Sequence, residues 1–322
     1  MADILKGLVG AGSTFVFAWV FPSAIALVVA YSVIARPLGL DSALGISGLA
    51  PAEQALALGF GSTVVGLVMN ALSTPLYRVL EGYLWPERLR SRGIARERSR
   101  RQALQRHVEE ATGLERSLAQ ERLQRFPRND EQTAPTRLGN AIRAFETYGS
   151  DRYQLDSQFM WIDLVAVAPE SVRKELETAR SSVDFFVATF YLSLIVGIGA
   201  CLTAVVAPTG FDVAILLVGI GSLVLVPVSY LSAVTSSTYW DATVRALVDL
   251  GRVPLAAALG LQLPSTIERE RAMWNLVVAF GYYRFNERWA DRLDPFRIGA
   301  TVPTVVTDAP RLADDQPTEP PS

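Results

Sequence analysis

The pattern of hydrophobic and polar positions divides the chain into long apolar stretches and densely charged ones. Four windows of at least 24 residues contain no Asp, Glu, Lys or Arg: 7–35, 54–77, 185–211 and 213–240. About 20 helical residues cross the hydrocarbon core of a bilayer, and buried helices of soluble proteins seldom run that long without charge. The pattern therefore predicts an all-α, polytopic membrane protein with four transmembrane helices and a separate helical domain.

The windows also predict how the chain is organised. We expect the four spans at about residues 12–35, 54–78, 185–206 and 212–236. They pair into two transmembrane hairpins, 1–86 and 185–236, separated by a helical segment at 87–184. Further helices are expected at 237–298, and residues 299–322, rich in Pro and Asp, are expected to be disordered.

An apolar stripe leads into the third window. Val172, Leu176, Ala179, Val183 and Phe186 recur at spacings of 4, 3, 4 and 3. This is the pattern of a helix that packs against a partner. Because a short turn joins the third and fourth spans, we expect both helices to continue past the membrane as an antiparallel hairpin.

Basic residues lie almost entirely on one side of the predicted spans. Near the span ends, eleven Lys and Arg flank the side that carries both termini and the 78–184 segment, against Arg36 alone on the other side. The positive-inside rule places the termini and the helical domain in the cytoplasm. Since Lys occurs only at Lys6 and Lys174, as in GC-rich genomes, we expect a multi-pass protein of the bacterial cell (inner) membrane.

Residues 87–126 form a charged stretch that is expected to be helical. From Arg78 to Arg128 the chain has thirteen Arg against seven acidic residues. A basic helix beside a membrane is attracted to anionic lipid by about 1 kcal/mol per basic residue near the surface. The alternative is a solvated face with Glu–Arg pairs such as Glu97–Arg101, and the pattern favours neither.

A dense polar stretch follows at 136–156, "TRLGNAIRAFETYGSDRYQLD". Thr136 is placed to cap a helix whose polar residues recur every three positions, and an i, i+4 pair follows. We treat these polar residues as a candidate interaction cluster: Arg137, Asn140, Arg143, Glu146, Arg152 and Asp156.

The stretch "NALSTPLYRVLEGYLWP" at 70–86 closes the second window. Arg78 can reach lipid phosphate, Tyr83 and Trp85 are typical of the headgroup level, and Glu81 can pair with Arg78 one turn away. Pro86 is expected to end the helix. These features predict a membrane-exit anchor rather than a reaction site.

The same window carries small and polar residues on one helix face, at spacings of 4, 4 and 3: Ser62, Gly66, Asn70 and Ser73. Small residues let helices approach closely, and hydroxyl and amide groups can also line a pore. Packing is the favoured interpretation.

Three stretches resemble segments of uncharacterised four-span membrane proteins common in high-GC bacteria: "NALSTPLYRVLEGYLWP", "PTRLGNAIRAFETYGSDRYQLD" and "ALVDLGRVPLAAALGLQLPSTIERERAMW". The resemblance implies the same topology and a place in the cell membrane, and it carries no activity.

Candidate chemistry is sparse. The chain has one cysteine, Cys201, and one histidine, His107, and it lacks the phosphate-loop, nucleophile-elbow and zinc-protease motifs. We predict no catalytic, cofactor-binding or metal-binding residues, a protein that is not an enzyme, and no nucleic-acid partner.

Two functional hypotheses follow. In the first, the protein is a membrane-tethered scaffold or adaptor that presents a cytoplasmic helical platform to a protein partner. In the second, copies of the chain assemble into a weakly selective pore that the cytoplasmic helices gate. The expected partners are the lipid bilayer, with anionic lipid at 87–126, and either further copies of the chain or a cytoplasmic protein.

Overall fold

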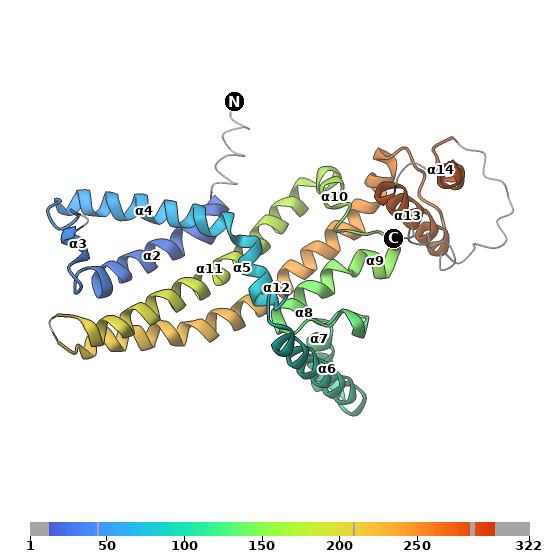
Figure 1. Cartoon of the computed structure of the whole chain (residues 1–322). Helices are drawn as coiled ribbons and strands as arrows, with labels where there is room; N and C mark the ends of the chain where they lie inside the picture. Colours follow the sequence, from blue (N-terminus) through green and yellow to red (C-terminus); the bar gives the residue numbers. More distant parts are fainter. Residues whose placement is uncertain (1–12, 44, 209, 284–286, 300–322) are drawn as a thin grey trace, which may run out of the picture. The chain divides into compact units, whose positions relative to one another are not determined.

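The computed structural model describes residues 13–43, 45–208, 210–283 and 287–299 (Figure 1). The predictions for Lys6 and for nearly all of the 299–322 tail lie outside these residues. Two compact units divide the chain: the first comprises Met1–Phe145 and Glu170–Arg245, and the second comprises Glu146–Pro169 and Ala246–Ser322.

Helices make up almost all of the regular structure. Within the described ranges there is no β-strand, only one isolated antiparallel bridge between Leu261 and Arg297. Among the described residues, four helices are long and apolar enough to cross a membrane: Ser13–Ala35, Pro51–Ala71 (α4), Glu170–Val206 (α11) and Val213–Ala258 (α12). The prediction of an all-α, multi-pass membrane protein is confirmed.

The first span combines α-helical and π-helical segments. It consists of the π-helical turn η1 (Val16–Val20), α2 (Phe21–Ala30) and a second π-helical turn, η2 (Tyr31–Ala35). Pro22 stands just after the first π-helical turn, where a proline disturbs the regular hydrogen-bond ladder.

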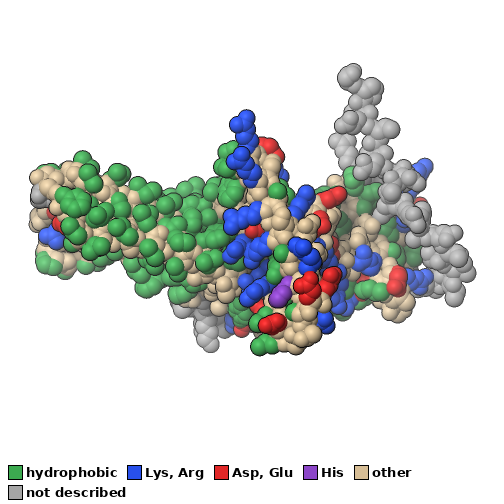
Figure 2. Space-filling model, turned by 90° about the horizontal axis from the view of Figure 1, so that it is seen from below, with side chains coloured by type: hydrophobic (Ala, Val, Ile, Leu, Met, Phe, Trp, Pro, Cys, Tyr) green, Lys and Arg blue, Asp and Glu red, His purple; other side chains and the backbone are tan. Residues whose placement is uncertain are grey.

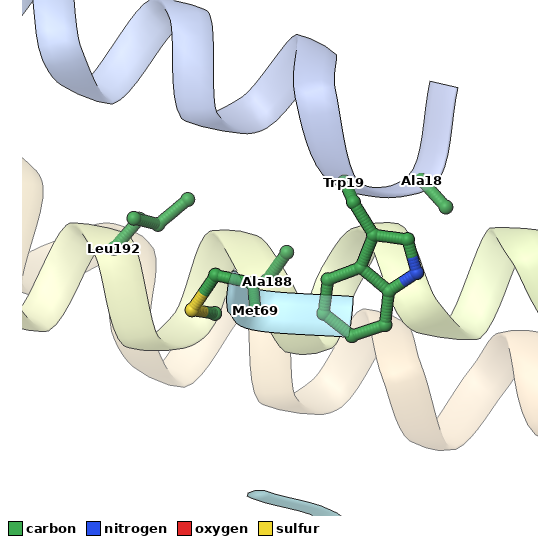
Figure 3. Close-up of a cluster of buried hydrophobic side chains, with 5 residues drawn as sticks. All are labelled: Ala18, Trp19, Met69, Ala188 and Leu192. Carbon is green, nitrogen blue, oxygen red and sulfur yellow. The ribbon is translucent and has the colours of Figure 1, made fainter. Parts of the chain in front are cut away.

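Close packing joins the first span to α4 and α11. A Cβ atom at Gly66 would lie 3.2 Å from the carbonyl carbon of Trp19, so the two backbones nearly touch. A buried cluster fills the space beside this contact (Figure 3): Ala18, Trp19, Met69, Ala188 and Leu192. Gly66 of α4 therefore serves helix packing, the interpretation favoured from the sequence.

The third and fourth spans form an antiparallel pair, α11 and α12 (Figure 1). A Cβ atom at Gly197 would lie 2.8 Å from Leu223 Cγ, and one at Gly219 would lie 2.9 Å from the backbone nitrogen of Cys201. The contacts pair earlier residues of α11 with later residues of α12, which is the antiparallel arrangement predicted from the short turn.

Both helices also continue well past their uncharged windows, as predicted. Leu176, Ala179 and Val183 of the α11 stripe are buried. Opposite them, the Tyr239 hydroxyl of α12 donates a hydrogen bond to the Glu175 carboxylate of α11. The extension of the hairpin is thus held by an apolar seam with a polar contact at its side.

The other described helices are not among these four apolar helices. In the first unit they are α3 (Leu40–Ala43), α5 (Ser73–Glu81), α6 (Glu87–Glu110), α7 (Gly113–Leu123), η3 (Asp130–Gln132) and α8 (Arg137–Glu146), whose last residue belongs to the second unit. In the second unit they are α9 (Tyr148–Tyr153), α10 (Trp161–Val167), α13 (Ile267–Tyr282), α14 (Glu287–Leu293) and η4 (Asp294–Phe296).

The charged stretch 87–126 is two helices rather than the single helix expected. Ala111 is extended, and Gly113 has a φ of +57°, a conformation that glycine adopts without steric cost. The guanidinium of Arg116 in α7 donates to the Val108 carbonyl of α6 over 3.1 Å. The stretch therefore folds back on itself as a helical hairpin.

The second span is also interrupted, near its charged end. α4 stops at Ala71 and α5 begins at Ser73. Pro75 explains the break, because it has no N–H to donate to the Ala71 carbonyl and its ring crowds that carbonyl. The single helix expected at 54–78 is thus two segments.

Candidate functional site

The predicted membrane-exit anchor lies on α5 and the turn that follows it. α5 ends at Glu81 and not at Pro86, because Gly82 takes a φ of +86°. The N–H of Tyr83 then donates to the Arg78 carbonyl over 2.9 Å, which is the closing hydrogen bond of a Schellman motif. Pro86 instead precedes the first residue of α6.

The side chains of this turn are suited to a membrane boundary. Arg78 and Tyr83 are exposed, and the indole of Trp85 donates to the Val79 carbonyl over 2.8 Å. Exposed Arg and Tyr at the end of an apolar helix are typical of headgroup contact.

The small-residue face of α4 is divided between two environments. Ser62 and Gly66 are buried, Ser73 in α5 is half-buried, and Asn70 is exposed. The Ser62 hydroxyl donates to the Leu58 carbonyl of its own helix over 2.6 Å. Two of the four residues thus take part in packing within the chain.

Tight backbone contacts bring α5, α6 and α8 together around one turn. A Cβ atom at Gly93 would lie 2.7 Å from the Pro135 carbonyl oxygen, and one at Gly139 would lie 2.7 Å from the Glu81 carbonyl oxygen. Only glycine fits at either position, since the opposing atoms are backbone. Thr136 caps α8 as predicted, because its hydroxyl accepts the Gly139 N–H over 3.0 Å.

Asn140 fixes this turn to α6. Its carboxamide oxygen accepts the Ala134 N–H over 2.8 Å, and its nitrogen donates to the Ala134 carbonyl and to the Glu97 carboxylate over 3.1 and 3.3 Å. Both Asn140 and Glu97 are buried. The predicted interaction residue Asn140 is therefore engaged inside the protein, where it positions neighbouring groups.

A pocket of about 170 Å³ opens beside this network, entirely within the first unit. Four arginines line it: Arg100, Arg122, Arg125 and Arg137. Its other lining residues are Glu97, Phe126, Asn140, Leu231, Val234 and Thr235. Figure 2 shows Lys and Arg side chains gathered next to an extended apolar surface.

The arginines of the pocket are only partly neutralised. Arg100 lies 3.5 Å from the Glu97 carboxylate, and Arg125 lies 3.0 Å from that of Glu121. Among the residues that the structure describes, neither Arg122 nor Arg137 has a carboxylate partner. Burial, and then repulsion by Arg137, lowers the pKa of Arg100. The site has an excess of positive charge that the protein itself does not balance.

The six residues of the predicted interaction cluster are divided between the two units. Arg137 and Asn140 line the pocket, and Arg143 belongs to the same unit. Glu146, Arg152 and Asp156 belong to the second unit.

Within the second unit these residues have separate contacts. The Glu146 carbonyl accepts the Ser157 hydroxyl over 3.2 Å. The Arg152 guanidinium lies 5.8 Å from the centre of the Tyr153 ring. The Asp156 carboxylate accepts the Tyr282 hydroxyl over 3.1 Å.

The second unit contains its own polar network, centred on Asp249. The hydroxyls of Tyr148 and Tyr153 both donate to this carboxylate, at 3.0 and 2.8 Å. Burial, followed by the hydrogen bond to Asp249, raises the pKa of both tyrosines. Arg252 lies over the Tyr153 ring at 4.6 Å, within cation–π range.

Glu270 completes that network from α13. Its carboxylate accepts two hydrogen bonds from Arg252, at 2.5 and 2.6 Å, and one from the buried Trp274 indole at 3.3 Å. Arg271 donates to the backbone carbonyls of Asp151 and Arg152. Arg252 is thus neutralised by a carboxylate within the unit, and Arg271 is held by backbone carbonyls.

The sequence interpretation singled out Arg137 but missed three other pocket arginines, Arg100, Arg122 and Arg125, and the partners of Glu97. The pair predicted between Glu97 and Arg101 does not form: Arg101 binds the Asp130 carboxylate and the Arg128 carbonyl, and Glu97 binds Arg100. The i, i+3 spacing of Glu97 and Arg100 was the available local signal.

Fold and site define the class of the chain as a multi-pass, all-α membrane protein with helices outside its spans and an arginine-lined pocket. No family model, curated protein or solved structure matches it. Among the described residues there is no group of three or more His, Cys, Asp or Glu that could hold a metal ion.

Proposed function

We propose that the protein is a non-enzymatic scaffold or adaptor, anchored by four spans in a bacterial cell membrane, whose remaining helices form a cytoplasmic platform. The asymmetry of basic residues supports this orientation, with eleven on one side of the spans against Arg36. The location in a bacterial cell membrane rests on the resemblance and on the preference for Arg over Lys.

The observation that carries the proposal is the surface of the second unit. Its interior is cross-linked by the paired network of Asp249 and Glu270, yet large apolar side chains lie exposed outside the uncharged windows: Phe159, Ile162, Leu250, Val253, Tyr282 and Tyr283. Of these, Phe159 and Tyr282 stack with ring centres 4.3 Å apart. A rigid support with exposed aromatic and aliphatic groups is suited to holding a protein partner.

No observation favours the pore hypothesis in the same way. Ser62 and Gly66 of the face suggested for a pore are buried against other parts of the chain. We therefore advance the scaffold alone.

Site-specific crosslinking tests the proposal. A photo-crosslinking amino acid at Ile162, 79% exposed, should capture one discrete protein in native membranes, and that protein should co-purify in a fixed ratio. The same group at Ser265, an exposed polar position of the same unit, should capture little. If neither position captures a protein and the purified chain conducts ions in liposomes, the scaffold is wrong.

A further inference from the structure

The arginine pocket lies where the fourth span is expected to leave the membrane. α12 begins at Val213, where the Asp212 carboxylate accepts the Ala214 N–H over 2.8 Å and caps the helix. Leu231 lies 18 residues further along. At about 1.5 Å per residue this is about 27 Å of helix, close to the ~30 Å of a hydrocarbon core. The pocket wall formed by α12 is therefore at headgroup level.

An apolar stripe on α12 leads into the pocket from the membrane side. Its exposed residues recur at spacings of 3, 4, 4 and 3, which places them on one helix face: Leu217, Ile220, Val224, Val228 and Leu231. Thr235, four residues after Leu231, continues this face and lines the pocket. Apolar surface suited to an acyl chain thus ends at a cluster of arginines.

The chemistry of the pocket selects an anion that carries oxygen acceptors. Glu97 supplies the only carboxylate of the pocket lining, and Glu121 pairs with Arg125 from outside it, so two of the four arginines are not neutralised. Glu97 already accepts hydrogen bonds from Asn140 and Arg100. Guanidinium groups match phosphate oxygens in bidentate geometry. Arg122 and Arg137 are free for this role, because neither pairs with a carboxylate in the described ranges.

The size of the pocket limits the ligand further. Its volume of about 170 Å³ is below the roughly 300–1,000 Å³ typical of sites for drug-sized ligands and cofactors. One water needs roughly 10–15 Å³ on such a measure, so the space suits a group of roughly 11–17 non-hydrogen atoms. A phosphate with a short polar substituent fits this limit, and a nucleotide exceeds it.

We propose that this pocket binds the phosphate headgroup of one anionic phospholipid, with Arg122 and Arg137 holding the phosphate and an acyl chain lying along the α12 stripe. The site differs from a basic helix lying on a charged surface, because it is a defined cavity for one lipid. It also stands independently of the scaffold function, since it involves only the first unit and the bilayer.

Native mass spectrometry of the full chain tests the proposal directly. Protein released from nanodiscs of equal phosphatidylglycerol and phosphatidylcholine should retain one phosphatidylglycerol in preference to phosphatidylcholine. The double variant Arg122→Gln/Arg137→Gln should lower that retention by about tenfold or more, because it removes the charge-assisted hydrogen bonds to phosphate.

A matched control separates the pocket from general surface charge. Arg96→Gln/Arg106→Gln removes the same charge from exposed positions of α6 outside the pocket, and it should change retention by less than about twofold. An equal loss in both double variants would overturn the proposal in favour of diffuse attraction. An equal preference for both lipids in the unmodified chain would overturn it as well.

Two further arms complete the test. Thr235→Trp keeps all four arginines and fills the pocket, so it should abolish selective retention of phosphatidylglycerol while leaving the thermal unfolding temperature within a few degrees of the unmodified chain.

Glycerol phosphate offers the same anion without an acyl chain and should not compete with phosphatidylglycerol at equal concentration. If it binds as well as the lipid, the site is one for a soluble phosphate and the lipid proposal fails.

Discussion

Each unit of the molecule contains a polar network built around arginine, and the two networks differ in how fully the arginines are neutralised. In the second unit, Arg252 is paired with Glu270 at 2.5 Å and also covers the Tyr153 ring. In the pocket of the first unit, Arg122 and Arg137 have no carboxylate partner in the described ranges. We call the network of the second unit closed, because Glu270 neutralises Arg252. We call the pocket of the first unit open, because Arg122 and Arg137 can still bind an anion.

The difference teaches how to separate structural charge from functional charge. A buried ion pair whose members satisfy each other holds helices in one arrangement and presents nothing to a ligand. The arginines of the pocket repel one another: burial, and then repulsion by Arg137, lowers the pKa of Arg100. A bound anion would relieve this repulsion. Five experiments probe this contrast and the packing that supports it.

The largest effect is expected from Glu270→Ala. The substitution leaves Arg252, whose side chain is 23% exposed, without its counter-charge, and it removes the acceptor of the Trp274 indole. Breaking a buried pair in this way costs about 3–5 kcal/mol of unfolding free energy. Thermal unfolding of the full chain in detergent measures this loss of unfolding free energy. As a control, Glu268→Ala changes an exposed position of the same helix and should cost less than about 1 kcal/mol.

A double substitution sharpens that result. Replacing both Arg252 and Glu270 by Met removes the charges together, so most of the lost stability should return. A double variant as unstable as Glu270→Ala would show that the damage comes from lost packing rather than from the unpaired charge.

Asn140→Ala should have the next largest effect. It leaves the N–H and carbonyl of Ala134 and the buried carboxylate of Glu97 without hydrogen bonds that Asn140 now makes. Each buried polar group left unsatisfied costs about 1–3 kcal/mol. Hydrogen exchange at the start of α8 and in the middle of α6 should rise, and unchanged exchange in both segments would contradict the role given to Asn140.

Gly66→Leu tests whether the small-residue face of α4 serves packing. A Cβ atom there would already lie 3.1 Å from Val20 Cγ2 and 3.2 Å from backbone atoms of the first span. Overpacking of this kind costs about 1–3 kcal/mol. Gly59→Leu adds the same side chain on the same helix where a Cβ atom meets nothing within 4 Å, so the thermal stability of that variant should stay unchanged. Equal effects would contradict the packing role.

The smallest effect concerns pH. Burial and the hydrogen bond to Asp249 raise the pKa of Tyr148 and Tyr153 above 10.0. As pH rises past 10, the unfolded chain loses these protons before the folded one does, so the free energy of unfolding falls. The stability that the two raised tyrosine pKa values contribute is fully present below pH 10. Between pH 8 and pH 10.5, the free energy of unfolding should fall less for Tyr153→Phe than for the unmodified chain. For the control Tyr283→Phe, at an exposed position, it should fall as much as for the unmodified chain.

The spans and the projecting hairpin were predictable because their signals are local and repeated. Uncharged windows longer than a bilayer is thick, and an apolar stripe at helical spacing, need no knowledge of distant contacts. The cap at Thr136 was predictable for the same reason. The breaks at Pro75 and Gly113 also had local signals, although the overall helical pattern concealed them.

The pocket was beyond such reasoning because its parts come from distant positions. Asn140 and Glu97 are 43 residues apart, and the apolar wall comes from α12, which starts only at Val213. The 136–156 polar stretch looked like one cluster along the sequence, but its residues belong to two units. Spacing on one helix shows which residues share a face, and it does not show which other element that face meets.

Hydrogen exchange of the full chain in nanodiscs tests most directly the claim that one network is open and the other closed. With phosphatidylglycerol in place of phosphatidylcholine, protection should rise in the segments of α6, α7 and α8 that line the pocket, and the segments around Asp249 and Glu270 should not change. Equal protection in both lipids, or a change centred on the second unit, would contradict the account.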